Sequence, residues 1–506
     1  MELYFLQSVC LYILSICFLI YLYNHNRSKR PITRGLKGVR SYPLVGHLPA
    51  YIRNRHRFLD WTTEILAEHP TQTVTYRRPG VVQGVITANP INVEYMLKTN
   101  FENYPKGDLF TSLLEDFLGR GIFNSDGELW KVQRKTAVYE FNTKSLRNFI
   151  LDSILQEIHE RLLPFLWKAT KNGEIINLQD VLEQFAFNNV CKIAFNEDPM
   201  CLGGEDEGRL PSQFAQAFED AANLSAGRFR YSIPFLWKIK KMLNIGSERR
   251  LRESITIIHD FATKIIKTRK KESSHGRDDL LSRFMASDDN SIEFLRDIII
   301  SFILAGRDTT SSALAWFFWI LSSRPDVEQK ILEELKLVTI QNGNSNFSFD
   351  DLQKMHYLHA SISEALRLYP PVAYDTKECH HDDVMPDGTF VGKGWLVSYH
   401  AYAMGRMESI WGPNCRDFTP ERWLENGVFK PESPFRFPAF NGGPRVCLGR
   451  EMAYLQMKLI VACVLERFEI DVVEKDSCPE QMLSLTLRIK GGLLVRVKER
   501  CMDEIH

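Results

Sequence analysis

The feature that most constrains the fold is a long, proline-free apolar stretch at 291–323, which predicts one helix. About 30 residues at ~1.5 Å each make a helix that crosses a whole domain. The stretch ends at Arg324-Pro325, where a helix normally stops. It is apolar on most faces, so we expect it to be buried, and Arg307 and Asp308 at its centre argue against a membrane-spanning role. The chain should therefore fold as a large, mostly helical domain around this helix.

Composition excludes several classes of protein. The chain has 506 residues, of which 44% are hydrophobic and 25% charged, close to ordinary globular usage. Lys plus Arg and Asp plus Glu number 63 each, so the basic excess typical of a nucleic-acid-binding protein is missing. The ten cysteines include no C-x-x-C pair, which leaves zinc ribbons and paired redox thiols without support.

The N-terminal segment departs from this average. Residues 3–23 carry no charge and are about as long as a membrane-spanning helix of ~20 residues. Basic residues follow from Arg27 to Arg40, so we expect the N-terminus in the lumen and the rest of the chain in the cytosol. The alternative is a cleaved signal peptide, but the basic cluster follows the apolar run and no cleavage site closes it. We therefore predict a retained single anchor at 1–26.

The remaining chain divides into a basic, proline-containing linker at 27–50 and a catalytic domain at 51–506. The segments on either side of Pro79-Gly80 predict a β-hairpin. The chain is then mostly helical up to about residue 370, and short strands return between Tyr374 and Tyr399. The tail LSLTLRIKGGLLVRV predicts a second hairpin. The predicted fold class is mostly α with small β-sheets, preceded by one transmembrane helix.

The long helix contains a polar motif at its centre, AGRDTT at 305–310. Glycine, an acid and hydroxyl residues are poor choices for a helix interior. We expect Thr309 to hydrogen-bond the carbonyl of Ala305 and to open the helix locally, making a small polar groove beside apolar surface. The alternative is a kink stabilised by a satisfied Asp308–Arg307 pair, and the motif alone does not separate the two interpretations.

One cysteine stands apart from the other nine. Cys447 lies in FNGGPRVCLG at 440–449, a pattern of the type F-x-x-G-x-R-x-C-x-G, and helix signals begin directly after it. The positive end of that helix would stabilise a thiolate at Cys447. Phe440 could shield the sulfur, and the glycines allow backbone N–H groups to point at it. Most single cysteines are buried and inert, but five fixed positions in ten residues favour an exposed thiolate.

Two weaker motifs accompany the cysteine. Glu364 and Arg367 share one side of a helix at i, i+3, and Arg422 follows in FTPERW. Trp130 and Arg134 lie one turn apart on another predicted helix. Taken singly, these residues are equally consistent with a surface ion pair and a core tryptophan.

All four motifs, in this order and at this separation, resemble the cytochrome P-450 superfamily of haem-thiolate mono-oxygenases, over essentially the whole chain. The resemblance implies that fold, haem b, and electrons from NADPH through an NADPH–cytochrome P-450 reductase on the same membrane, the endoplasmic reticulum. One departure is the linker, which is less proline-dense than the hinge usual in that superfamily.

The resemblance also implies roles for individual residues. Cys447 would be the axial iron ligand, and Asp308 and Thr309 would form the oxygen-activating pair. Glu364, Arg367 and Arg422 would form a buried triad on the proximal side. The residues that would hold or surround the haem are Trp130, Arg134, Lys377, Phe440, Gly443 and Arg445.

A finer resemblance is to the plant fatty-acid omega-hydroxylase branch. It is carried by FLGRGIFNSDGELWKVQRK, FILAGRDTTSSALAWFFWIL and HAYAMGRMESIWGP. The branch implies hydroxylation near the end of an aliphatic lipid chain, with a fatty acid first and a sterol side chain or a jasmonoyl–amino-acid conjugate as alternatives. The residues expected to line the pocket are Phe110, Leu113, Phe123, Phe302, Ala305, Val372, Ala373 and Leu485.

Two other classes of function remain open from the sequence. A haem-thiolate isomerase needs no acid–alcohol pair, so Asp308-Thr309 argues against it. A non-catalytic haem sensor or membrane adaptor would show no reductase-dependent turnover. The residues predicted to dock the reductase are Lys131, Lys135, Arg416 and Arg450, although ordinary solvated side chains explain them equally well. No nucleic-acid partner is expected.

Overall fold

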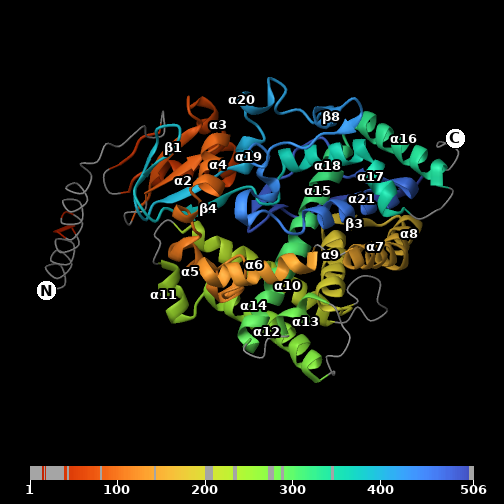
Figure 1. Cartoon of the computed structure of the whole chain (residues 1–506), viewed down its shortest axis with the longest axis horizontal. Helices are drawn as coiled ribbons and strands as arrows, with labels where there is room; N and C mark the ends of the chain where they lie inside the picture. Colours follow the sequence, from red (N-terminus) through yellow and green to blue (C-terminus); the bar gives the residue numbers. More distant parts are fainter. Residues whose placement is uncertain are drawn as a thin grey trace.

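The computed structural model describes residues 14, 15, 18, 39–42, 45–79, 83–141, 144–199, 209–231, 236–271, 279–285, 290–342 and 347–500. Over these ranges the protein is mostly helical with small sheets, as the sequence predicts (Figure 1). The predicted anchor at 1–26 lies almost entirely outside the described residues, as does much of the linker.

The long apolar stretch forms one continuous rod of three parts: α14 (Ile292–Ile303), a π-helical turn η5 (Leu304–Asp308) and α15 (Thr309–Leu321). Ser291 caps its N-terminus by accepting a 3.2 Å hydrogen bond from the N–H of Phe294. Within the described ranges it is the one helix long and apolar enough to cross a membrane, but 78% of its most apolar window is buried. This confirms the prediction, made from Arg307 and Asp308 at its centre, that the stretch is a buried core helix of the domain.

The other helices surround this rod, and α15, α18 and α21 lie together at the centre of the molecule (Figure 1). Those before it are α2 (Leu48–Asn54), α3 (Phe58–Glu68), α4 (Pro90–Glu94), α5 (Gly107–Leu118), α6 (Gly127–Phe141), α7 (Lys144–Glu157), α8 (Leu163–Asn172), α9 (Leu178–Phe195), α10 (Arg209–Phe229), α11 (Leu236–Leu243), α12 (Ser247–Lys271) and α13 (Leu280–Met285). Those after it are α16 (Pro325–Asn342), α17 (Phe349–Lys354), α18 (His356–Leu368), α19 (Ala401–Met404), α20 (Glu408–Trp411) and α21 (Arg450–Arg467). Shorter 3-10 and π turns are η1 (Arg55–Arg57), η2 (Tyr95–Thr99), η3 (Phe101–Asn103), η4 (Ile158–Leu162), η6 (Pro420–Trp423), η7 (Pro438–Phe440) and η8 (Gly443–Arg445).

The largest sheet lies at one end of the molecule beside α2, α3 and α4 (Figure 1). Its strand order is β1-β2-β7-β4, with β2 and β7 parallel and the other pairs antiparallel. A three-stranded sheet has the order β10-β13-β3, and the remaining strands form two-stranded pairs. The strands are β1 (Thr73–Arg77), β2 (Gln83–Thr87), β3 (Ile175–Asn177), β4 (Asp375–Glu378), β5 (Asp383–Val384), β6 (Phe390–Val391), β7 (Leu396–Tyr399), β8 (Leu424–Glu425), β9 (Val428–Phe429), β10 (Phe468–Val472), β11 (Gln481–Leu483), β12 (Leu487–Ile489) and β13 (Leu494–Glu499).

Two segments differ in detail from the sequence predictions. The first half of the tail forms a hairpin of β11 and β12, but the second half, β13, does not join it and pairs with β10 and β3 instead. The positive φ angles of Gly491 and Gly492 turn the chain away before β13 begins, so these glycines separate two sheets instead of joining two strands. Helix α2 begins at Leu48, inside the segment predicted as linker, with Pro49 in its first turn, where proline is tolerated.

Candidate active site

The cysteine loop has a rigid backbone. The N–H of Cys447 donates a 2.8 Å hydrogen bond to the carbonyl of Phe440, which closes the loop. Gly443 has a φ of 61°, and a Cβ there would lie 1.9 Å from the carbonyl oxygen of Leu97. Only glycine is compatible with this position, so the loop can reach its tight turn against η2 because Gly443 has no side chain.

The Cys447 thiol has the surroundings of a thiolate ligand. Helix α21 begins three residues later with Gly449 at its N-cap, so the positive end of the helix lies near the sulfur. Burial raises the pKa of the Cys447 thiol, while the Gly449 N–H bond and the charges of Arg134 and Arg450 act to lower it. The side chain nevertheless remains accessible. Burial has the larger effect on this pKa, so the loop presents an accessible sulfur with positive charge beside it, and a bound metal ion would complete the stabilisation of a thiolate.

Arg445 lies at the junction of the cysteine loop and α6. Its guanidinium carbon is 4.4 Å from the centre of the Trp130 ring, and it donates a 2.6 Å hydrogen bond to Asp126. Its Nε is buried and has no hydrogen-bond partner in the described part of the chain. Arg134, one turn after Trp130, also makes no hydrogen bond to a described residue. The side of the cysteine loop that faces α6 therefore has two positive charges, with N–H groups that make no hydrogen bond to a described residue.

Lys377 adds a further buried cation nearby. Its Nζ donates a 2.9 Å hydrogen bond to Asp375, which also accepts a 2.6 Å bond from Lys106. Burial lowers the pKa of Lys377 to about 7, and repulsion from Lys106 and Arg445 acts in the same direction. Burial acts to raise the pKa of Asp375, but the two lysines outweigh it and lower that pKa.

The second predicted cluster is fully assembled under the site. Glu364 and Arg367 form a two-pronged ion pair with both distances 2.7 Å, and both side chains are completely buried. Arg422 reaches the same carboxylate at 3.3 Å. Trp423, which the sequence did not single out, donates a 2.8 Å hydrogen bond from its indole N–H to Glu364. Its position directly after Arg422 in the quoted motif is the signal that could have indicated it.

The polar motif of the long helix shows features of both interpretations. Thr309 donates a 2.6 Å hydrogen bond to the carbonyl of Ala305, and the helix widens into the π turn there. Gly306 lets α9 approach, because a Cβ would lie 2.6 Å from Val190. Asp308 is at the same time paired with Arg307 at 2.6 Å, and both side chains are buried. The groove and the satisfied ion pair therefore coexist.

A cavity of about 770 Å³ begins at the π turn and is lined there by Leu304, Ala305 and Thr309. Five of the predicted pocket residues line it: Phe110, Phe123, Ala305, Val372 and Leu485. Three predicted pocket residues do not: Leu113, Phe302 and Ala373 are buried in the core instead. They are apolar neighbours of lining residues on the same elements, and sequence position alone does not reveal which side of an element faces a cavity.

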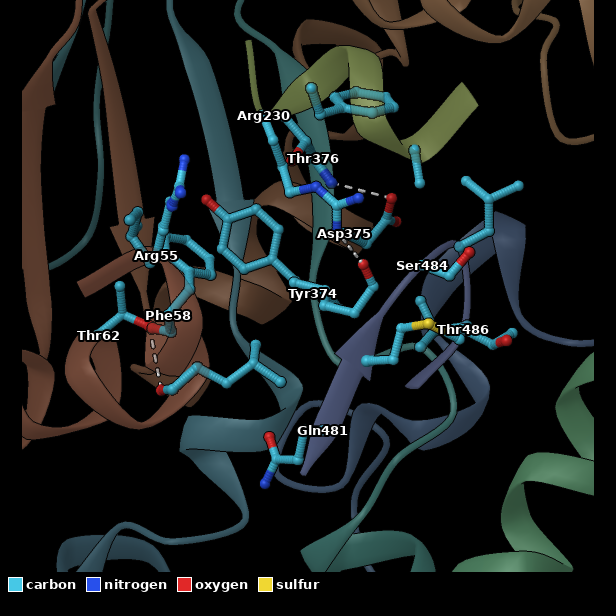
Figure 2. Close-up of a pocket in the computed structure, with 18 of the residues that line it drawn as sticks. Arg55, Phe58, Thr62, Arg230, Tyr374, Asp375, Thr376, Gln481, Ser484 and Thr486 are labelled. Carbon is cyan, nitrogen blue, oxygen red and sulfur yellow. Dashed lines mark hydrogen bonds between the residues drawn. The ribbon is translucent and has the colours of Figure 1, made fainter. Parts of the chain in front are cut away.

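The lining of the cavity is also charged. Its cations are Arg55, Arg57, Arg77, Arg78, Lys106, Arg230 and Lys490, and its acids are Asp60, Asp375 and Glu480. Figure 2 shows Arg55 and Arg230, from two separate segments, with the adjacent Tyr374 and Asp375 among the residues that line the cavity. The sequence reading missed this cationic group, because its members come from distant parts of the chain.

Comparison with known proteins decides the family. The family model described as cytochrome P450 matches residues 36–496. The chain belongs to the cytochrome P450 family. It is 54% identical to cytochrome P450 CYP94D108 of Paris polyphylla over 462 residues, covering 90% of this chain and 91% of that protein. It is 47% identical to cytochrome P450 94B1 of Arabidopsis thaliana, with 91% of each chain covered. Against cytochrome P450 94A1 of Vicia sativa the identity is 45%, with 91% and 90% covered.

This P450 is therefore a mono-oxygenase that uses thiolate-ligated haem and electrons supplied by a reductase. When bound, the haem supplies the oxygen-activating chemistry, and the protein positions substrate and protons. The residues described above fit this group. The unpartnered Nε of Arg445 and the unbonded Arg134 suit anionic propionates, and the accessible Cys447 suits the iron.

The predicted reductase-docking residues lie on the surface. Lys131, Lys135, Arg416 and Arg450 are all exposed. Lys131 is paired with Glu128 at 2.9 Å, and Arg450 contacts Glu451 at 3.2 Å. Lys131 and Lys135 lie on α6 together with Trp130 and Arg134, and Arg450 begins α21 directly after the cysteine loop.

Proposed function

We propose that this P450 hydroxylates the terminal region of an aliphatic lipid chain, with a free fatty acid as the first choice. The observation that carries this proposal is the mixed lining of the cavity: apolar residues lie beside Thr309, which we take as its inner end, and cations outnumber acids among the charged residues that line the rest, its outer end. An acyl chain would fill the inner end with its methyl group, and its carboxylate would stay outside. Holding the chain in one orientation can outweigh the greater reactivity of interior C–H bonds.

Two arginines at the outer end are free to meet a carboxylate. Neither the Arg55 nor the Arg77 side chain bonds to a described residue, whereas Arg230 donates a 2.6 Å bond to the carbonyl of Leu483. Lys490 is already paired with Glu480 at 2.8 Å. Arg55 and Arg77 are therefore the residues with which an anionic head group could form new ion pairs.

For the site residues we propose the roles that their geometry supports. Cys447 ligates iron, and the residues that hold or surround the haem are Trp130, Arg134, Lys377, Phe440, Gly443 and Arg445. Glu364, Arg367 and Arg422 fix the loop beneath it. Asp308 and Thr309 supply protons for oxygen activation, supported by the Thr309–Ala305 bond and the π turn.

The experiment compares dodecanoate with dodecanol on the purified holoenzyme. We expect dodecanoate to give the spectral shift of substrate binding, and mass spectrometry to find the hydroxyl at or next to the terminal carbon. The double variant Arg55→Gln/Arg77→Gln should weaken dodecanoate binding several-fold at low salt and leave dodecanol unaffected. Lys490→Gln, whose ammonium is already paired, is the control.

Other outcomes assign a different substrate. Predominantly mid-chain products contradict the terminal-hydroxylase proposal. A preference for a hydroxysterol that is insensitive to the arginine variants assigns the sterol side chain instead. Turnover of a jasmonoyl–amino-acid conjugate that loses affinity in the arginine variants assigns the conjugate.

We further propose that residues 1–26 anchor the protein in the endoplasmic reticulum membrane with the catalytic domain in the cytosol. The proposal is supported by the uncharged segment 3–23 and the basic residues that follow it. Deletion of residues 1–26 should release a substantial part of the protein on alkaline extraction of membranes. A truncated chain that stays fully in the membrane would assign retention to other surfaces.

A further inference from the structure

A chain of buried ion pairs runs from the π turn to the surface of α10. Arg307 donates one hydrogen bond of 2.6 Å to Asp308 and another of 2.7 Å to Glu183 on α9. Glu183 also accepts from Arg488 on β12. Arg488 in turn contacts Glu219 on α10 at 2.9 Å, and that side chain is 30% exposed. The buried acid beside the cavity is therefore linked to solvent through four other charged groups.

This chain has more acids than bases. The charged groups that face Glu183 are Arg307 and Asp308 from the π turn, Arg488 from β12 and Asp180 from α9 itself. With Glu219 there are four carboxyls to two guanidiniums, and the Nε of Arg488 is buried with no hydrogen-bond partner among the described residues. Burial raises the pKa of Glu183 to about 7, and that of Asp308 is raised by burial too. Such a cluster can exchange a proton near neutral pH.

The shared arginine couples the two carboxylates. Arg307 gives one N–H group to each acid, so the strength of one ion pair depends on the charge state of the other. An ionised Glu183 both competes for Arg307 and repels the ionised form of Asp308. It therefore favours a protonated Asp308, next to the cavity-lining Thr309.

We propose that Glu183 is a positioning residue for oxygen activation: through Arg307 it sets the proton affinity of Asp308 and holds that carboxyl beside Thr309. Without the charge of Glu183, Arg307 pairs with Asp308 alone, and Asp308 holds its proton less firmly. Proton supply then fails at a lower pH than in the wild type. The proposal requires mono-oxygenase activity but not the identity of the substrate.

The test uses Glu183→Gln in the holoenzyme, because the amide keeps the shape of the side chain and can still accept one hydrogen bond. The measurement is the amount of product formed per NADPH consumed, as a function of pH. The alkaline limb of this pH profile should move to lower pH by about one unit, which is a tenfold change in proton affinity. Infrared difference spectra between pH 5.5 and pH 8 provide a measurement independent of turnover. The wild type should show a buried carboxyl that loses its proton, and the variant should lack that band.

Glu174→Gln is the matched control, because Glu174 is an exposed acid that accepts a 2.8 Å hydrogen bond from Asn172 and is not one of the charged groups that face Glu183. It should leave the pH limb close to that of the wild type. If Glu183→Gln does not take up haem, Glu219→Gln at the exposed end replaces it and should give a smaller shift in the same direction. Two results overturn the proposal and leave Glu183 a structural ion-pair partner. One is an alkaline limb that does not shift in the tested variant, and the other is a loss of product per NADPH that is equal at every pH.

Discussion

Two buried ion-pair networks flank the site, and they differ in how many of their hydrogen-bonding groups have a partner. In the first, which we call the proximal network, Glu364 and Arg367 are joined by Arg422 and Trp423. All N–H groups of Arg367 are used: two bonds go to Glu364 and the others to the carbonyls of Gly405, Cys415 and Asp417. The second is the distal network of Asp308, Arg307, Glu183, Arg488 and Glu219. Its carboxyls outnumber its guanidiniums, and the Nε of Arg488 has no partner in the part of the chain that the structure describes.

The difference indicates different tasks. A buried ion pair contributes to a unique structure when every donor and acceptor is satisfied, and breaking it leaves an uncompensated charge. The proximal network meets this condition and ties α18 to the segment that leads to the cysteine loop. The distal network does not, so its members can change protonation and pairing without unfolding the domain. The predictions below test this contrast, in order of their expected effect on the free energy of unfolding.

The largest effect is expected for Arg367→Ala. Removing this side chain leaves the fully buried Glu364 with Arg422, at 3.3 Å, as its remaining cation among the described residues, and breaking a buried pair costs about 3–5 kcal/mol. Arg367→Lys should fail too, because lysine lacks the planar fork that reaches three carbonyls and a carboxylate. Thermal unfolding and the carbon-monoxide difference spectrum are the measurements. A lysine variant with normal haem content and stability would contradict the structural role of the proximal network.

The distal network should instead make stability depend on pH. Folding raises the pKa of Glu183 from 4.5 to about 7, so between these values the folded protein keeps a proton that the unfolded chain releases. Stability should therefore fall as pH rises through this window, by up to about 1.4 kcal/mol per pH unit. Thermal midpoints at pH 5 and pH 8 measure the difference. In Glu183→Gln that difference should shrink, and an unchanged difference would show that Glu183 titrates normally.

A smaller effect is expected for Trp423→Phe, which removes one donor to Glu364 and keeps an aromatic ring. Leaving a buried carboxylate one hydrogen bond short costs about 1–3 kcal/mol. Trp319→Phe is the control, because the indole N–H of Trp319 is buried with no partner among the residues described. It should destabilise less than Trp423→Phe. Equal losses would mean that ring packing, rather than the hydrogen bond, accounts for both.

The same contrast explains what the sequence could predict. Local patterns identified the cysteine loop, the helix opening at Thr309 and the pairing of Glu364 with Arg367, because their partners lie within one turn or one motif. The sequence did not predict the distal network, because its contacts join residues that are far apart in the chain. Glu183 is 124 residues from Arg307 and 305 residues from Arg488. The second half of the tail departs from the predicted hairpin for the same reason: β13 pairs with β10 and with β3, which is far away in sequence, and not with the adjacent β12.

The smallest effect on stability is expected for Thr309→Ala, although its effect on function should be large. Its hydroxyl donates to the carbonyl of Ala305, a bond that opens the helix rather than holding it together, so its loss should cost less than about 1 kcal/mol. The same hydroxyl lines the cavity beside Asp308, where protons are needed. We therefore expect normal haem and substrate binding, but several-fold more hydrogen peroxide per NADPH consumed.

Thr309→Ser is the matched control, since it keeps the hydroxyl and loses one methyl group. It should retain most of the wild-type ratio of product to peroxide, whereas the alanine variant should not. If Thr309→Ala forms product as efficiently as the wild type, the hydroxyl serves only the shape of the helix. The proposed functional role of the distal network would then be contradicted at Thr309, the residue at which this network meets the cavity and at which the role should be most evident.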